Sequence, residues 1–104
     1  MSNYEREASI RPPIFDGRNF VYWKVRIITY IQYLGTEFWD IVETGYTFPL
    51  ETPTDTAGKK QHETNAKVVN TLLGCLSQSE FVKVMQFKSA KEIWDKIDLS
   101  YERR

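Results

Sequence analysis

Near the amino terminus the chain reads Pro13-Ile14-Phe15-Asp16-Gly17-Arg18-Asn19-Phe20-Val21-Tyr22-Trp23. Pro13 and the proline before it favour extended backbone, and the pair Asp16-Gly17 is typical of a turn. Asn19 belongs to a residue type that caps helices, so we expect a helix to begin at about Phe20. The stretch therefore predicts an extended segment that carries Phe15, then a turn, then a helix.

The helix predicted from about Phe20 to Leu34 has two apolar faces. Spacings of three and four residues place one set on a continuous face: Phe20, Trp23, Ile27, Tyr30, Ile31 and Leu34. A second stripe, made of Val21, Val25 and Ile28, lies roughly 100° round the same helix. A broad core face and a surface for a partner explain this second stripe equally well, and both interpretations stay open.

Four further helices are predicted downstream. They cover about 37–43 and 60–76, and two more begin at about Gln78 and Ala90, each after a capping-box pattern of the Ser-x-x-Glu type. The third predicted helix has one face made of Ala66, Val69, Leu73 and Leu76. The last has a face made of Ala90, Ile93, Trp94, Ile97 and Tyr101. The apolar run at 81–87 also suits a strand, but the serine cap before it favours a helix.

These elements predict an all-α fold, a single compact bundle of about five helices. Residues 1–11 are polar and are expected to form a flexible arm, which leaves 12–104 as the helical domain. Residues 46–58, with two prolines and a glycine, predict an irregular connector. The expected core and signature residues are Phe15, Phe20, Trp23, Ile27, Trp39, Leu73, Trp94, Ile97 and Tyr101.

Charge and composition exclude several function classes. Fourteen basic residues balance fourteen acidic ones and interleave with them, so no basic stripe for nucleic acid is evident and direct nucleic-acid binding is not expected. The tryptophans fall on apolar helix faces, which favours core packing over base stacking. No stretch is apolar enough to suggest a membrane span or a signal peptide, so we expect a cytoplasmic protein without membrane contact.

The residue inventory does not favour catalysis or metal binding. His62 and Cys75 are the only histidine and the only cysteine, and one of each cannot complete a usual zinc site or form an internal disulfide. His62 is expected at the solvated surface, and Cys75 is expected as a small core residue. Residues 53–60 lack the first glycine and the Ser or Thr of a phosphate-binding loop. We therefore expect no enzyme activity, no cofactor and no metal.

Three stretches together carry a family resemblance. They are Phe15-Asp16-Gly17-x-Asn19-Phe20-x-x-Trp23, Phe38-Trp39-Asp40-Ile41-Val42-Glu43-x-Gly45, and Ser89-Ala90-Lys91-Glu92-Ile93-Trp94-Asp95 followed by Tyr101. Their order and spacing resemble the amino-terminal, capsid-like region of copia-type retrotransposon Gag proteins. The resemblance implies a helical capsid amino-lobe that packs into Gag shells or ribonucleoprotein particles. The second helical region and the zinc knuckle usual in such proteins do not follow, so the chain is expected to be a fragment, a truncated remnant or a host-recruited copy.

Two functions compete on this basis. The first is a self-associating capsid domain whose partner is a second copy or another Gag-like chain, with Val21, Val25 and Ile28 as the candidate assembly surface. The second is a host-recruited adaptor that binds a peptide in a groove beside Phe15 and the first helix. Phe15 itself is expected either to staple the bundle or to leave such a groove open.

Overall fold

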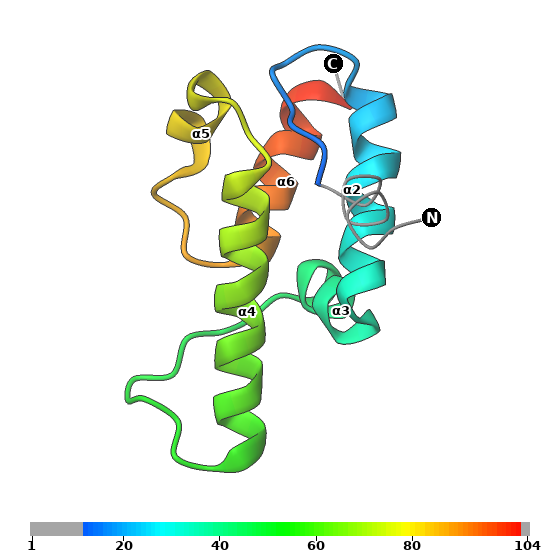
Figure 1. The fold of residues 1–104 in the computed structure, drawn as a ribbon. Coiled ribbons are helices and arrows are strands. Elements are labelled where there is room, and N and C mark those ends of the chain that lie inside the picture. Colours follow the sequence, from blue (N-terminus) through cyan, green and yellow to red (C-terminus); the bar gives the residue numbers. More distant parts are fainter. Residues whose placement is uncertain (1–11, 103–104) are drawn as a thin grey trace.

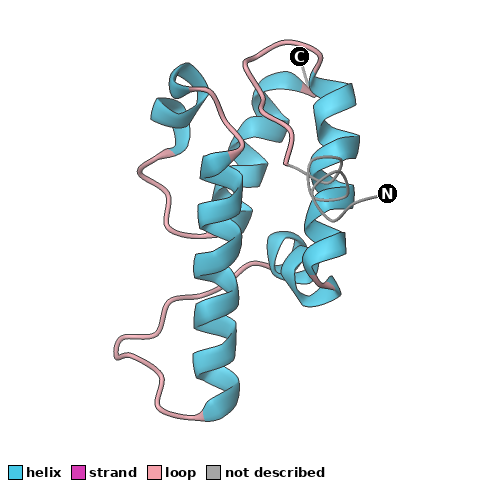
Figure 2. Cartoon of the chain, in the orientation of Figure 1, coloured by secondary structure: helices cyan, strands magenta, loops and turns pink. Residues whose placement is uncertain are grey.

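Five helices form the framework of residues 12–102, which is the part of the chain that the computed structural model describes (Figures 1 and 2). In chain order they are α2 (Phe20–Leu34), α3 (Thr36–Thr44), α4 (Thr56–Gly74), α5 (Gln78–Val84) and α6 (Ala90–Tyr101). The extended pairing within this range is an isolated parallel bridge between Phe15 and Leu76. The predicted all-α class is confirmed for these residues, and the predicted arm at 1–11 lies outside them.

Helix α3 is the junction of the bundle, because it packs against α2, α4 and α6. Helix α4 also packs against α6, and α5 rests on α6. Figure 1 shows the amino-terminal half of α4 extending beyond the other helices, next to the loop that joins α3 to α4. The extended segment before α2 lies at the opposite end of the molecule, near the last turn of α6.

The core draws buried apolar side chains from every helix and from the segment before α2. They are Phe15, Phe20, Trp23, Ile27, Ile31, Ile41, Val42, Val68, Leu72, Cys75, Leu76, Val84, Ala90, Ile93, Trp94 and Ile97. Aromatic rings contact one another through the centre of this core. Phe15 stacks on Trp23 with 4.8 Å between the ring centroids, and Trp23 stacks on Trp94 at a centroid distance of 5.9 Å. Trp39 contacts Trp94 edge-on at a centroid distance of 5.3 Å. Aromatic packing of this kind joins the segment before α2 to α6 and α3.

The expected core residues behave as two groups. Phe15, Phe20, Trp23, Ile27, Trp94 and Ile97 are buried. Trp39, Leu73 and Tyr101 are half-buried and pack against that core from its edge. Sequence periodicity therefore identified the centre of the core, whereas Trp39, Leu73 and Tyr101 form part of its rim.

Helix bounds were predicted well at the start of the chain and less well in the middle. Helix α2 matches its predicted range, and α3 is one residue longer at each end. Helix α4 begins at Thr56 rather than at about Lys60, because the Asp55 carboxylate accepts a hydrogen bond from the Gly58 N–H at 2.9 Å and caps the helix. The connector predicted over 46–58 is correspondingly shorter.

The predicted inner face of α4 was partly wrong: Leu76 is buried, and Val69 and Leu73 pack against the core from its edge, but the most deeply buried residues of the helix are others. Its buried residues are Thr64, Asn65, Val68 and Leu72, while Ala66 is exposed and Val69 is half-buried. Asn65 explains the rotation: its Nδ2 donates to the Lys88 carbonyl and its Oδ1 accepts from the Ala90 N–H, both at 3.0 Å. A buried amide with both groups bonded fixes the start of α6 against α4.

Capping was predicted correctly at one of the serine sites. The Ser89 Oγ accepts from the Glu92 N–H at 3.2 Å and donates to the Glu92 carboxylate at 2.8 Å. Ser77 makes no cap bond from its side chain, and neither does Asn19, which adopts a left-handed backbone with φ of 55°. At the start of α3, Gly35 is the cap residue and Thr36 is the first helical residue.

Candidate functional site

Two regions of the molecule are candidates for binding a partner. The first is the extended segment 12–15, here called the strap. The Phe15 N–H donates to the Cys75 carbonyl, and the Ser77 N–H donates to the Phe15 carbonyl, both at 2.8 Å. The Trp23 Nε1–H donates to the Pro13 carbonyl at 3.1 Å. The strap is thus held by backbone bonds to the α4–α5 junction and by one side-chain bond from α2.

The Phe15 side chain anchors the strap in the core. Its ring is 1% exposed. It meets the Phe20 ring edge-on at 5.6 Å, stacks on Trp23, and meets the Tyr101 ring edge-on at 4.9 Å. Of the two roles expected for Phe15, the structure has the one in which it caps the bundle. The groove beside α2 is therefore filled by the chain itself.

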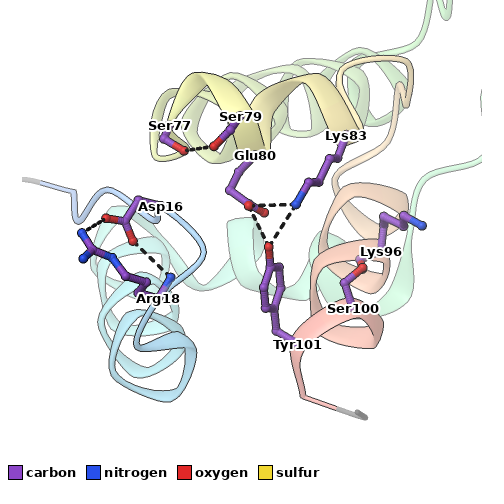
Figure 3. Close-up of polar contacts among 9 residues, drawn as sticks. All are labelled: Asp16, Arg18, Ser77, Ser79, Glu80, Lys83, Lys96, Ser100 and Tyr101. Atoms are coloured by element: carbon purple, nitrogen blue, oxygen red, sulfur yellow. Dashed lines mark hydrogen bonds and ion pairs between the residues drawn. The ribbon is translucent and has the colours of Figure 1, made fainter.

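Beside the turn that follows the strap lies a polar cluster from α5 and α6 (Figure 3). The Glu80 carboxylate is buried and accepts from the Tyr101 hydroxyl at 2.7 Å and from the Lys83 Nζ at 3.0 Å. Lys83 also donates to the Tyr101 hydroxyl at 3.2 Å. Two donors to one buried carboxylate provide the compensation that such a group needs.

The cluster changes the titration of its members. The pKa of Lys83 is raised, chiefly because its ammonium donates to Glu80. Burial is the first cause that raises the pKa of Tyr101, and the bond to the Glu80 carboxylate is the second. Sequence reasoning missed this cluster, because Glu80 was read as the last residue of a capping box. The spacing of Glu80 and Lys83 by three residues was the available signal for part of it.

The turn from 16 to 19, here called the hinge, joins the strap to α2. Gly17 has a φ of 97°, and Asn19 also has positive φ, so two of its four residues adopt a conformation that side chains disfavour. A Cβ on Gly17 would lie 3.1 Å from the Glu80 Oε2. Asp16 and Arg18 form an exposed ion pair at 2.8 Å, visible in Figure 3, which lowers the pKa of Asp16. Such a pair contributes little to stability.

The second surface is the outer face of α2. Val21 is 68% exposed and Val25 is 61% exposed, whereas Ile28 is half-buried and packs against the core. Tyr22 is exposed beside them, and Arg26 donates to its hydroxyl at 2.8 Å. The predicted stripe therefore divides into two exposed valines and one residue that belongs partly to the core.

An ion pair joins this face to α6. The Lys24 Nζ lies 3.0 Å from the Asp98 carboxylate and 3.6 Å from the Glu102 carboxylate. Hydrogen bonding to Asp98 is the main reason that the pKa of Lys24 is raised. The contact keeps α6 along one flank of α2, so Val21 and Val25 stay uncovered on the other side of Lys24.

His62 and Cys75 occupy different surroundings from one another. His62 was expected at the solvated surface, but it is half-buried: its Nδ1 lies 3.1 Å from the Tyr46 hydroxyl and its ring packs against Tyr46 and Phe48. Cys75 is buried as expected, and burial raises the pKa of its thiol to about 11. No group of three potential metal ligands occurs within residues 12–102.

Surface depressions also occur elsewhere on the molecule. One of about 480 Å³ lies between α3 and α4, where Lys59, Lys60 and Lys67 stand with Glu37 and Glu63. Both charge signs are present, so the lining favours neither an anionic nor a cationic ligand. No helix in the described range is both long and apolar enough to span a membrane.

Comparisons with protein families, with curated proteins and with solved structures give no match. The resemblance to copia-type Gag proteins therefore stays a prediction from the sequence. What the structure adds is the all-α bundle, the strap and the exposed face of α2.

Proposed function

We propose that the chain is a structural interaction domain of a Gag-like protein, which self-associates into capsid or ribonucleoprotein particles through the outer face of α2. The observation that carries this proposal is the exposure of Val21 and Val25 on one side of a helix whose other side is core. The resemblance in the sequence supplies the class of assembly. The exposed valines on the outer face of α2 are the proposed contact between copies.

The energetics fit an assembly built from weak, repeated contacts. Full burial of a valine side chain is worth about 1.5–3 kcal/mol, and a symmetric interface uses each residue twice. A stable specific interface buries roughly 1,200–2,000 Å², more than two valines supply. Tyr22 and Tyr33, both exposed on α2, would add aromatic area to the same contact. A single pair of domains then associates weakly, and a particle gains stability from many such pairs.

Light scattering across a wide concentration range, at low and moderate salt, tests this proposal. The unmodified chain is expected to gain mass as its concentration rises, and the double variant Val21→Asp with Val25→Asp is expected to stay monomeric. Val82→Asp is the matched control, because Val82 is also an exposed valine on a helix, α5, away from this face. An unmodified chain that is monomeric throughout, or a double variant that associates equally well, contradicts the proposal.

A peptide-binding adaptor is the second candidate, favoured by the way in which the bundle pairs with an extended segment. The α4–α5 junction offers one backbone carbonyl and one N–H, and both are taken by Phe15. A peptide partner must displace the strap from this position. Deletion of residues 1–17 tests the idea: a folded domain that binds a proline- and phenylalanine-containing peptide supports the adaptor, and an unfolded chain contradicts it.

A further inference from the structure

The strap binds the helical bundle through a small set of hydrogen bonds and ring contacts, much as a separate peptide would. The part of the bundle that it contacts is here called the receiving site. Within residues 12–102, the hydrogen bonds of the strap go to segments that follow the hinge: two backbone bonds to the α4–α5 junction, and one from Trp23. The Phe15 ring fills a site formed by Phe20, Trp23 and Tyr101. None of these contacts requires that the strap and the receiving site belong to the same molecule.

The hinge that connects the strap to the receiving site on the bundle is short, and part of its backbone has an unfavourable conformation. The hinge contains Gly17 and Asn19 at positive φ, and Asn19 carries a Cβ in that region without a cap bond from its side chain. The ion pair of Asp16 with Arg18 is exposed and lies within the hinge itself. Opening the hinge therefore gives up little and relieves the left-handed backbone.

We propose that two copies of this chain exchange straps, so that the Phe15 of each copy fills the site on the other. The exchange preserves every strap contact, because the second copy presents an identical receiving site, and it changes only the hinge. The proposal is independent of the outer face of α2, since it needs neither Val21 nor Val25. If straps exchange, the conformation of the hinge, rather than a new surface, determines the equilibrium between monomer and dimer.

Gly17 is the position where this balance is most open to change. In the closed hinge, a side chain at position 17 would crowd the Glu80 carboxylate and would have to adopt a φ of 97°, which L-residues disfavour. Both the steric and the backbone penalty disappear when the hinge extends. Gly17→Val is therefore expected to shift the monomer–dimer midpoint by about tenfold or more toward the dimer. Gly45→Val is the matched control: Gly45 also has positive φ, at 88°, but its neighbour is the Lys91 side chain and it is remote from the strap.

A distance readout separates strap exchange from any other dimer. One population carries a donor fluorophore at Ile14→Cys on the strap, and a second carries an acceptor at Gln78→Cys beside the receiving site. Both native side chains are exposed, and the buried Cys75 is shielded from the reagents. The two populations are mixed, unfolded, refolded together and separated by size. Energy transfer in the dimer fraction is expected to match that of a single chain bearing both labels.

The outcomes divide cleanly. A Gly17→Val chain that stays monomeric at its solubility limit overturns the proposal, and so does a dimer without transfer between copies. If Gly17→Val fails to fold, the same transfer measurement on chains with the unmodified hinge, refolded at their solubility limit, decides the matter by the same two criteria. Val21→Asp with Val25→Asp in the Gly17→Val background keeps the dimer if straps exchange. Loss of the dimer there assigns it to the α2 face and overturns exchange.

Discussion

At the scale of single residues, the polar groups buried in or beside the core each have a physical reason to be there. Glu80 enters because Tyr101 and Lys83 donate to it, and Asn65 enters because two backbone groups satisfy it. Cys75 enters as a neutral thiol among apolar side chains. Burial without a charged partner favours the protonated thiol, which makes its contribution to stability depend on pH.

Cys75 gives a prediction for alkaline pH. Its pKa is raised from 9.0 in the unfolded chain to about 11 in the folded one, so its stabilisation is complete below pH 9 and is lost as the pH rises through 11. Between these values the unmodified chain is expected to lose about 2 kcal/mol more unfolding free energy than Cys75→Ala. Urea unfolding under reducing conditions, followed by tryptophan fluorescence, measures the difference.

The comparison uses each protein as its own reference, because Cys75→Ala also leaves a small cavity that lowers stability at every pH. Tyr101 has a raised pKa as well, and it contributes to both proteins. The pKa of Tyr30 is raised first by burial and then by Cys75, so part of any difference between the two proteins comes from Tyr30. Parallel curves for the two proteins from pH 9 to pH 11 would contradict the assignment of this loss to Cys75.

At the scale of the elements, two similar serine motifs have different structures. Ser89 and Glu92 bond as a helix cap, whereas Ser77 bonds the Ser79 hydroxyl and leaves Glu80 to face α6 (Figure 3). The difference arises because Tyr101 and Lys83 offer Glu80 charge-assisted bonds that a capping box cannot match. The Ser77 backbone is used instead, since its N–H pairs with the strap.

This pair supplies an internal comparison for helix capping. Ser89→Ala is expected to cost about 1 kcal/mol of unfolding free energy, because the Glu92 N–H at the start of α6 loses its acceptor. Ser77→Ala is expected to change stability by less than about 0.5 kcal/mol, since its hydroxyl bonds only the exposed Ser79. Urea titrations of the two variants measure both values. Equal costs would show that Ser77 caps α5 in solution.

The same residues show how far sequence reasoning reaches. Periodicity and the helix start expected at Phe20 were enough to predict α2 from Phe20 to Leu34, because those signals are local. The pairing of Phe15 with Leu76 and the turn of Glu80 toward Tyr101 depend on residues far apart in the chain, so no local pattern carries them. The face of α4 was misjudged for the same reason. Asn65, a polar residue, is buried because it bonds the Lys88 carbonyl just before α6 and the Ala90 N–H at its start.

At the scale of the whole molecule, the strap connects the two ends of the described chain. It begins at Pro12, it pairs with the α4–α5 junction, and its phenylalanine meets Tyr101 in the last turn of α6. Helix α2, which the strap precedes, is joined to α6 by Lys24 as well. The strap therefore belongs to the same cooperative unit as the helices that it contacts.

That integration is tested by removing the anchor. Phe15→Ala is expected to lower the unfolding free energy by about 3–5 kcal/mol, because it deletes a fully buried ring. Ile14→Ala is the matched control, an adjacent and exposed strap residue, and is expected to change stability by less than about 0.5 kcal/mol. Urea unfolding at low protein concentration measures both. A loss of under about 1 kcal/mol for Phe15→Ala would show that the strap docks separately from the bundle.

The contact between Phe15 and Tyr101 also has a consequence for biosynthesis. A ribosome synthesises the strap early and the last turn of α6 late, and at about 5–20 residues per second the interval is roughly 4 to 17 seconds. During that interval the Phe15 ring has no completed site on its own chain. The strap is therefore expected to dock fully only after the last turn of α6 has been synthesised.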